Sequence, residues 1–244
     1  MKLSKRNVAL AAGISLLIMA AVAAFSFGYV HSTLVVEGSP AETYRNLQLS
    51  GPLFIGGIAG WIIILICDVL AAWALYYFFK EVNKNLSLAT AWIRVIYAAV
   101  LGVAIYNLIA VLPLAHTSGN DTTDNAKPVI DYLTAFETIW SAGLIIFGVH
   151  LLGLGYLSLK ADFVPGIFGW LLLVAGISYF FLNLAKAIPT GSEQLLANIE
   201  TILSIPMAIA EIGFALWLVI SGGKTKSYTR REIQADTLTI GKSR

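Results

Sequence analysis

Four ionisable residues stand inside long apolar runs, where a membrane-spanning helix would cross the hydrocarbon of the bilayer. They are Asp68, Arg94, His150 and Glu211. A charge at the bilayer centre costs on the order of 2.5–3.5 kcal/mol, so such side chains face a protein interior or a water-filled cavity, usually beside a partner. With His150 neutral, their formal charge sums to −1, and burial disfavours an uncompensated charge. We therefore expect the four residues to bind a proton, a cation or a small polar group.

The depth of each residue follows from the 1.5 Å rise of a helix. Counted from the nearest predicted cytoplasmic end, Asp68 lies about 18 Å deep, His150 about 15 Å and Glu211 about 20 Å. Arg94 lies about 12 Å deep, and its long side chain reaches further. The four residues therefore fall in one slab near the middle of the membrane. Glu137 lies closer to the outer surface, and we expect it to be an interfacial carboxylate.

The same four residues also have an architectural interpretation. Asp68 and Arg94 lie on adjacent predicted helices, so they would form a buried ion pair that fixes helix register, with His150 and Glu211 nearby. In that case the protein is a structural or regulatory membrane subunit. A third possibility is an intramembrane enzyme acting on a lipid or isoprenoid, with His150 and a carboxylate as acid and base. The sequence leaves these alternatives open.

Motifs for other chemistry are missing from the sequence. There is no Walker loop, G-x-S-x-G or H-E-x-x-H pattern. Only His150 is within a span, because His31 and His116 fall in predicted outer loops, so a paired haem site is not expected. We therefore assign no catalytic residue, cofactor or metal. A role as an enzyme stays open, although a non-enzymatic role is favoured. Cys67 is the single cysteine and cannot form an intrachain disulfide.

The composition indicates a membrane protein. Of 244 residues, 58% are hydrophobic and 12% are charged, against about 25% charged in soluble domains. Several apolar runs exceed about 18 residues, which is enough to cross a bilayer. We predict an all-α polytopic bundle forming one domain over residues 1–221, followed by a basic, disordered cytoplasmic tail over residues 222–244. The six predicted transmembrane helices cover approximately residues 8–30, 52–79, 88–112, 132–159, 166–188 and 199–220.

The orientation follows from the distribution of lysine and arginine, which accumulate on the cytoplasmic side of a membrane. If both termini are cytoplasmic, that side receives twelve of the sixteen basic residues and the opposite side receives three. The three are Arg45, Lys127 and Lys186, and Arg94 is within a span. The sequence therefore predicts cytoplasmic N- and C-termini.

Several motifs resemble a known family. They are DVLAAWALY at 68–76, VNKNLSL at 82–88, AWIR at 91–94, HLLGLGY at 150–156, FVP at 163–165 with Gly169, and EIGFALWL at 211–218. These stretches are similar to signatures of the bacterial membrane family called domain of unknown function 4386. The resemblance covers approximately residues 8–220, and its motifs include all four slab residues.

The resemblance implies a multi-pass protein of the bacterial inner (plasma) membrane with about six helices, and it implies no activity. Beside the lipid bilayer, we expect a small solute or cation as partner. Nucleic-acid binding has no support beyond the short basic tail. The oligomeric state, partner subunits and identity of the solute stay open.

Overall fold

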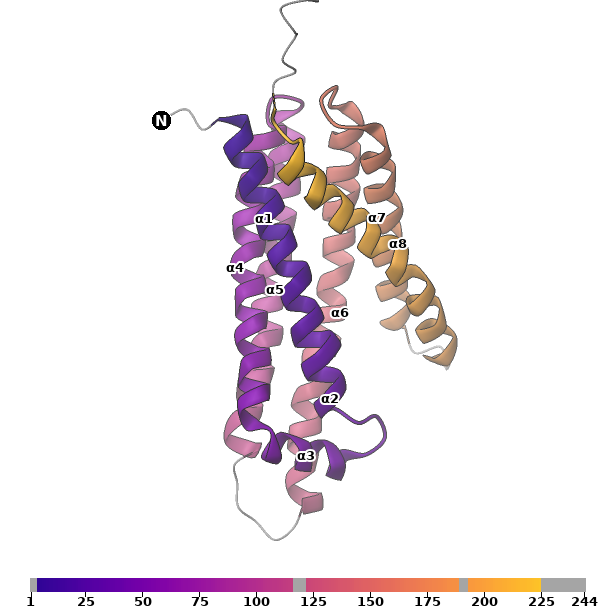
Figure 1. Cartoon of the computed structure of the whole chain (residues 1–244). Helices are drawn as coiled ribbons and strands as arrows, with labels where there is room; N and C mark the ends of the chain where they lie inside the picture. Colours follow the sequence, from indigo (N-terminus) through magenta and orange to yellow (C-terminus); the bar gives the residue numbers. More distant parts are fainter. Residues whose placement is uncertain (1–3, 116–121, 189–192, 225–244) are drawn as a thin grey trace, which may run out of the picture.

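The computed structural model describes residues 4–115, 122–188 and 193–224 and is built from helices throughout (Figure 1). Within these residues, six helices are long and apolar enough to cross a membrane, which confirms the predicted all-α six-helix bundle. The first span continues from α1 through a π-helix, η1, into α2. The elements are α1 (Lys5–Ala23), η1 (Ala24–His31), α2 (Ser32–Leu34), α3 (Pro40–Leu49), α4 (Gly51–Phe79), α5 (Lys84–Ala115), α6 (Thr122–Lys160), α7 (Gly166–Lys186) and α8 (Glu193–Ile220).

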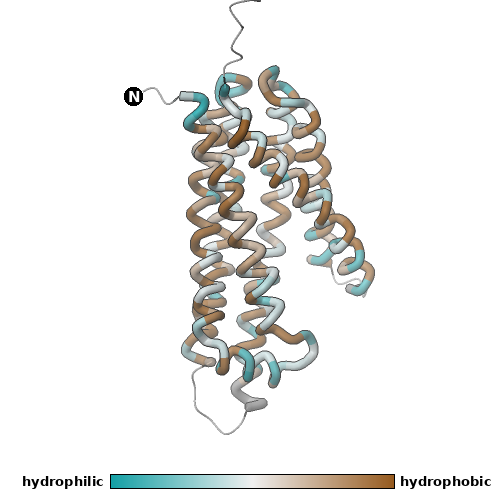
Figure 2. The backbone as a smooth tube through the Cα atoms, viewed as in Figure 1, coloured by the Kyte–Doolittle hydropathy of each residue, from teal (hydrophilic) through white to brown (hydrophobic). Residues whose placement is uncertain are grey.

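Polar residues at the ends of apolar runs determine where helices begin. The Ser4 hydroxyl accepts a hydrogen bond from the Asn7 N–H of α1 at 3.1 Å, and the Asn83 side chain accepts one from the Leu86 N–H of α5 at 3.0 Å. These oxygens satisfy N–H groups that have no partner within the first helical turn. Figure 2 shows the result, with hydrophobic residues through the middle of the bundle and hydrophilic ones concentrated toward its ends.

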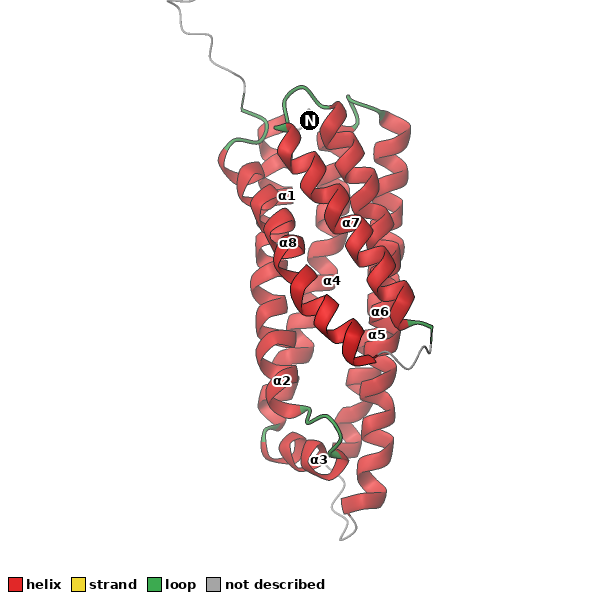
Figure 3. Ribbon diagram, turned by 90° about the vertical axis from the view of Figure 1, so that its right-hand side faces the viewer, coloured by secondary structure: helices red, strands yellow, loops and turns green. Residues whose placement is uncertain are grey.

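The six long helices form a ring in chain order. Each packs against the next, from α1 through α4, α5, α6 and α7 to α8, and α8 packs back against α1. The start of α1, the end of α8 and the turns joining α4 to α5 and α6 to α7 share one end of the ring (Figures 1 and 3). We call this the Lys5 end and the opposite one the α3 end. The Lys5 end is the side predicted to be cytoplasmic.

Arg6 of α1 closes the ring at the Lys5 end. Its Nη1 donates to the carbonyls of Leu218 at 3.1 Å and Gly222 at 2.9 Å, and its Nη2 donates to the carbonyl of Val219. The last carbonyls of a helix have no partner within it, so this guanidinium caps α8 and also offsets its dipole. Gly13 lets the two helices touch, since a Cβ there would lie 2.7 Å from Val219 Cγ2.

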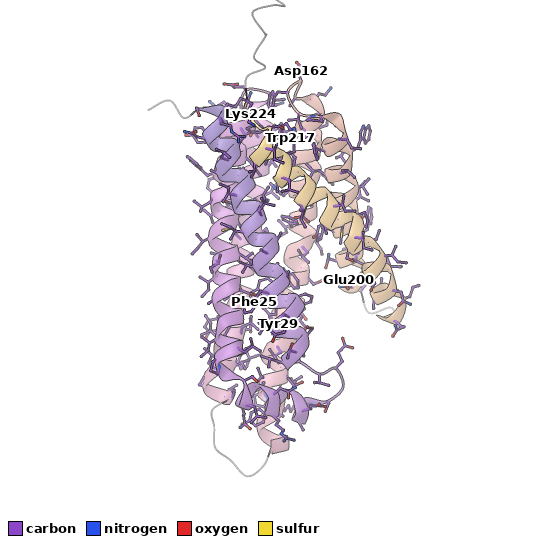
Figure 4. All side chains as sticks on the ribbon, viewed as in Figure 1. Phe25, Tyr29, Asp162, Glu200, Trp217 and Lys224 are labelled. Atoms are coloured by element: carbon purple, nitrogen blue, oxygen red, sulfur yellow. The ribbon has the colours of Figure 1, made fainter. Side chains whose placement is uncertain are left out.

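Toward the α3 end, α8 moves away from α1 (Figures 1 and 3). Only 28% of the most apolar stretch of α8 is buried, whereas 50% of the corresponding stretch of α6 is buried. Pro206 lies inside α8 and lacks the N–H that a helix interior needs, which weakens the helix at this point. Glu200 lies on the diverging half (Figure 4). The ring is therefore closed at one end and open at the other.

Glycines bring α6 and α7 into close backbone contact. A Cβ on Gly176 would lie 2.9 Å from the Gly148 carbonyl oxygen and 2.9 Å from the Leu152 nitrogen. One on Gly155 would lie 2.9 Å from the Gly169 carbonyl oxygen. Small residues at such positions let spanning helices pack without a hydrophobic driving force between them. These two helices therefore form a tightly joined pair.

A methyl group added at Gly176 should separate this pair. We expect Gly176→Ala to lower the free energy of unfolding by about 1–3 kcal/mol, because the new carbon meets backbone that cannot move aside. The measurement is the melting temperature of the purified protein in detergent. Gly213→Ala is the matched control, since its nearest contact is Phe168 at an ordinary 3.6 Å. Equal melting temperatures for the two variants would contradict this packing.

Cysteine labelling tests the predicted orientation. Cys67 is the lone cysteine, so Cys67→Ser gives a background for single cysteines at Ser39, near the α3 end, and Lys224, at the Lys5 end. In intact cells we expect a membrane-impermeant thiol reagent to label Ser39→Cys and not Lys224→Cys, because basic residues concentrate at the Lys5 end. Labelling of Lys224→Cys alone would reverse the orientation.

Candidate functional site

Asp68 of α4 and Arg94 of α5 form an ion pair deep inside the ring. Asp68 Oδ1 lies 2.7 Å from Arg94 Nη2, and both side chains are at most 2% exposed. Within the described residues, neither Oδ1 nor Arg94 Nε makes a well-directed hydrogen bond, so the short contact is held by charge attraction more than by hydrogen-bond geometry. The two formal charges cancel, so neither side chain remains as an uncompensated charge in the bilayer interior.

His150 of α6 lies on the other side of the guanidinium. Its Nε2 is 3.1 Å from Arg94 Nη1, and its Nδ1 is 2.9 Å from the carbonyl oxygen of Thr90. Because a carbonyl oxygen only accepts, Nδ1 carries a proton and Nε2 accepts from the guanidinium. This arrangement suits a neutral imidazole. Asp68, Arg94 and His150 therefore form one buried network, which we call the triad.

Two further side chains complete the surroundings of Arg94. Met19 of α1 places its Sδ 3.7 Å from Arg94 Nη2, and the Phe147 ring centroid lies 5.4 Å from the guanidinium carbon. Arg94 thereby reaches across the ring from α5 to α1 and also contacts α4 and α6. A single side chain thus connects four of the six spanning helices.

The triad is packed without space for a solute. The cavity beside His150 has a volume of about 10 Å³, which is at the lower limit for a single water molecule. A Cβ at Gly153 of α6 would lie 2.6 Å from Thr90 Oγ1 of α5, so this glycine permits the close approach that brings His150 to the Thr90 carbonyl. In this conformation the triad joins α4, α5 and α6, and the void beside His150 is too small for a substrate.

Glu211 of α8 does not join the triad. Its Oε1 accepts a hydrogen bond from the Tyr179 hydroxyl of α7 at 2.8 Å, and the residue is half-buried. Phe147 connects the two sites, since its ring meets that of Tyr179 edge-on at 5.3 Å and lies over Arg94. The predicted slab therefore divides into a charge-paired triad and a separate carboxylate.

A cavity of about 910 Å³ opens at the α3 end, between η1, α6, α7 and the diverging half of α8. Ion pairs and hydrogen bonds join its walls. His31 and Glu137 are 3.0 Å apart, and Ser141 Oγ donates to Asn183 Oδ1 at 2.9 Å. Glu137, which the sequence predicted to be an interfacial carboxylate, thus lines this cavity. We call this space the α3-end cavity.

The cavity and Glu211 lie along the same face of α7. Asn183 and Lys186 line the cavity, and Tyr179 precedes Asn183 by one helical turn. The Asn183 amide donates to the Tyr179 carbonyl at 2.8 Å, and the Tyr179 hydroxyl continues to Glu211. A row of polar groups therefore leads from the cavity toward the membrane interior.

Sequence reasoning overlooked Tyr179 and Asn183. Asn183 carried a signal, since an amide inside an apolar run needs a hydrogen-bond partner. Tyr179 carried none, because tyrosine is also common in the core and at membrane interfaces. Within the described residues, no three His, Cys, Asp or Glu side chains are gathered closely enough to hold a metal ion.

Comparison with known proteins gives a family and no activity. The family described as Domain of unknown function (DUF4386) matches residues 11–222, which confirms the predicted resemblance. An uncharacterized protein of Archaeoglobus fulgidus is 31% identical over 170 residues, or 70% of this chain and 86% of the relative. No solved structure matches the chain.

Removing the Arg94 side chain should leave the buried Asp68 carboxylate without a counter-ion. We expect Arg94→Ala to cost about 3–5 kcal/mol, because Asp68 loses its counter-ion, and to deplete the protein from the membrane fraction. Immunoblotting of membranes and the melting temperature in detergent measure this loss. Arg45→Ala, which removes an exposed arginine of α3, is the matched control.

A double variant separates charge pairing from packing. Asp68→Asn with Arg94→Met removes both charges and should recover much of the lost abundance, because no lone charge remains. If the double variant is as depleted as Arg94→Ala, shape and not charge compensation holds the triad together.

Proposed function

Since the chain belongs to the family described as Domain of unknown function (DUF4386), we propose from its geometry that it handles a small solute, cation or proton in the inner membrane, with Glu211 as the binding carboxylate. The observation that carries the proposal is the isolation of Glu211. Asp68 is neutralised by Arg94 at 2.7 Å. Glu211 has a tyrosine hydroxyl beside it and no ion pair within the described part of the chain.

A carboxylate at this depth needs a positive partner or a proton. Tyr179 donates one hydrogen bond, which orients the carboxyl group without cancelling its charge. Ionisable residues inside spans typically mark ion pathways and proton relays for this reason. Glu211 would therefore exchange a proton for a cation, and each would compete with the other for the same oxygens.

The α3-end cavity supplies the route to Glu211. Its lining includes Asn183, whose amide contacts the Tyr179 carbonyl one turn deeper. The helix that carries Glu211 is also the least buried of the six spans and contains Pro206. Movement of α8 relative to α7 would open a path from the α3-end cavity to Glu211. The triad would keep α1, α4, α5 and α6 in place during this movement.

The architectural alternative applies to the triad itself. The triad's packing and the void of about 10 Å³ beside His150 favour a role in fixing helices. In a purely structural or regulatory subunit, Glu211 would serve only to join α8 to α7. The enzymatic alternative with His150 as acid or base has less support, because the imidazole is fully buried and both its nitrogens are engaged.

Glu211→Gln tests the proposal. Tyr179 can donate to the amide oxygen as it does to the carboxylate, so the fold should persist while the charge is lost. We expect wild-type protein in detergent to gain thermal stability from one member of a panel of cations and small metabolites, with binding that strengthens from pH 5 to 8 as protons cease to compete. Glu211→Gln should lose both the stabilisation and its pH dependence.

The control for this experiment is Glu81→Gln, which removes an exposed carboxylate at the Lys5 end and should behave as wild type. A ligand that stabilises Glu211→Gln as strongly as wild type would overturn the proposal. If no compound stabilises either protein, the architectural alternative is favoured and the search should turn to partner subunits.

A further inference from the structure

The α3-end cavity carries a surplus of negative charge. Three carboxylates, Glu37, Glu137 and Glu200, line it together with one ammonium group, that of Lys186. Glu200 pairs with Lys186 at 2.6 Å and Glu137 with His31 at 3.0 Å, whereas Glu37 makes no ion pair with any residue that the structure describes. The surplus remains whether or not His31 is protonated, so the cavity attracts cations.

The walls of the same cavity are aromatic and aliphatic. Phe27 of η1 and Trp140 of α6 meet with ring centroids 4.9 Å apart, and Phe27 also stacks on His31 at 5.1 Å. Aromatic faces attract cations, and tryptophan does so most strongly. The remaining apolar lining includes Val35, Val36, Ile130, Leu133 and Leu144. Such walls suit a ligand that combines a positive charge with apolar groups.

An inorganic ion fits these features less well. A hard metal ion takes six or more oxygen ligands that converge on one point, and within the described residues no three candidate ligand side chains converge in this way. Two of the three carboxylates already have close partners, His31 for Glu137 and Lys186 for Glu200. The volume of about 910 Å³ matches pockets for small organic molecules.

We propose that the α3-end cavity binds an organic cation with apolar substituents, of the quaternary ammonium or phosphonium class. The inference rests on the proposed function and specifies the class of its solute. Glu37, Glu137 and Glu200 supply the field that draws the cation in, and the Phe27 and Trp140 side chains that line the cavity contact its apolar groups. The polar row through Asn183 and Tyr179 then connects this entry site to Glu211.

Two ions of the same shape and opposite charge test the charge selectivity. Binding of tetraphenylphosphonium and tetraphenylborate to the protein in nanodiscs is measured by isothermal titration calorimetry, with empty nanodiscs subtracted. We expect saturable binding of the phosphonium and none of the borate. Glu37→Gln should weaken phosphonium binding about fivefold, since one nearby charge is lost. Glu42→Gln, which removes an exposed carboxylate of α3 outside the cavity, should leave it unchanged.

Trp140→Leu should also weaken phosphonium binding about fivefold, through loss of the aromatic face. Trp140 packs against Trp61 and Phe136, so the Trp140→Leu substitution can impair folding. If it does, the Glu37→Gln variant decides the test, because the Glu37 side chain is exposed. Equal binding of both ions, no saturable binding of either, or equal affinity in wild type and Glu37→Gln overturns the inference.

These outcomes are separable from those of the Glu211 experiment. A Glu211-dependent ligand of another chemical class, without phosphonium binding, overturns the cation inference and leaves the proposed function standing. Phosphonium binding that depends on Glu37 and Trp140 but not on Glu211 supports the cavity as a cation site and overturns the role given to Glu211.

Discussion

The ion pair between Asp68 and Arg94 is the constraint on which the arrangement of the bundle depends. In the bilayer interior either charge alone is costly, so the register of α4 against α5 that brings Asp68 Oδ1 and Arg94 Nη2 to 2.7 Å is favoured over others. The same guanidinium then contacts His150 and Met19, which sets α6 and α1 relative to that pair. Electrostatic attraction thus positions the helices here, as the hydrophobic effect does in a soluble core. In lipid, apolar helices have no hydrophobic driving force to associate with one another.

The molecule consequently has a well-anchored part and a loosely held part. The triad joins α1, α4, α5 and α6, and glycine contacts attach α7 to α6. By contrast, α8 is held at the Lys5 end through Arg6 and at its middle through Glu211, and it diverges from α1 toward the α3 end (Figure 1). The α3-end cavity lies along this divergence, so it adjoins the helix with the fewest anchors.

The sequence revealed the spans and much of the buried network, but not how its members meet. Length and hydropathy predict six helices, and depth along each helix placed Asp68, Arg94 and His150 at one level, where the structure brings them into contact. Depth does not specify rotation about the helix axis, so Glu211 lies at a similar level and yet contacts Tyr179. The π-helix η1, α3 and the cavity were not predicted, because they depend on packing between segments distant in sequence.

The contact between Arg6 and the end of α8 has a consequence for biosynthesis. The carbonyls it binds belong to residues 218, 219 and 222, which leave the ribosome more than two hundred residues after Arg6. Until then the Arg6 guanidinium of α1 lacks its hydrogen-bond acceptors at the end of α8. The triad on α4, α5 and α6 can already form beside α1 at this stage. The ring can therefore close only after the end of α8 has been made, and a chain stalled before α8 would leave the flank of α1 open to lipid.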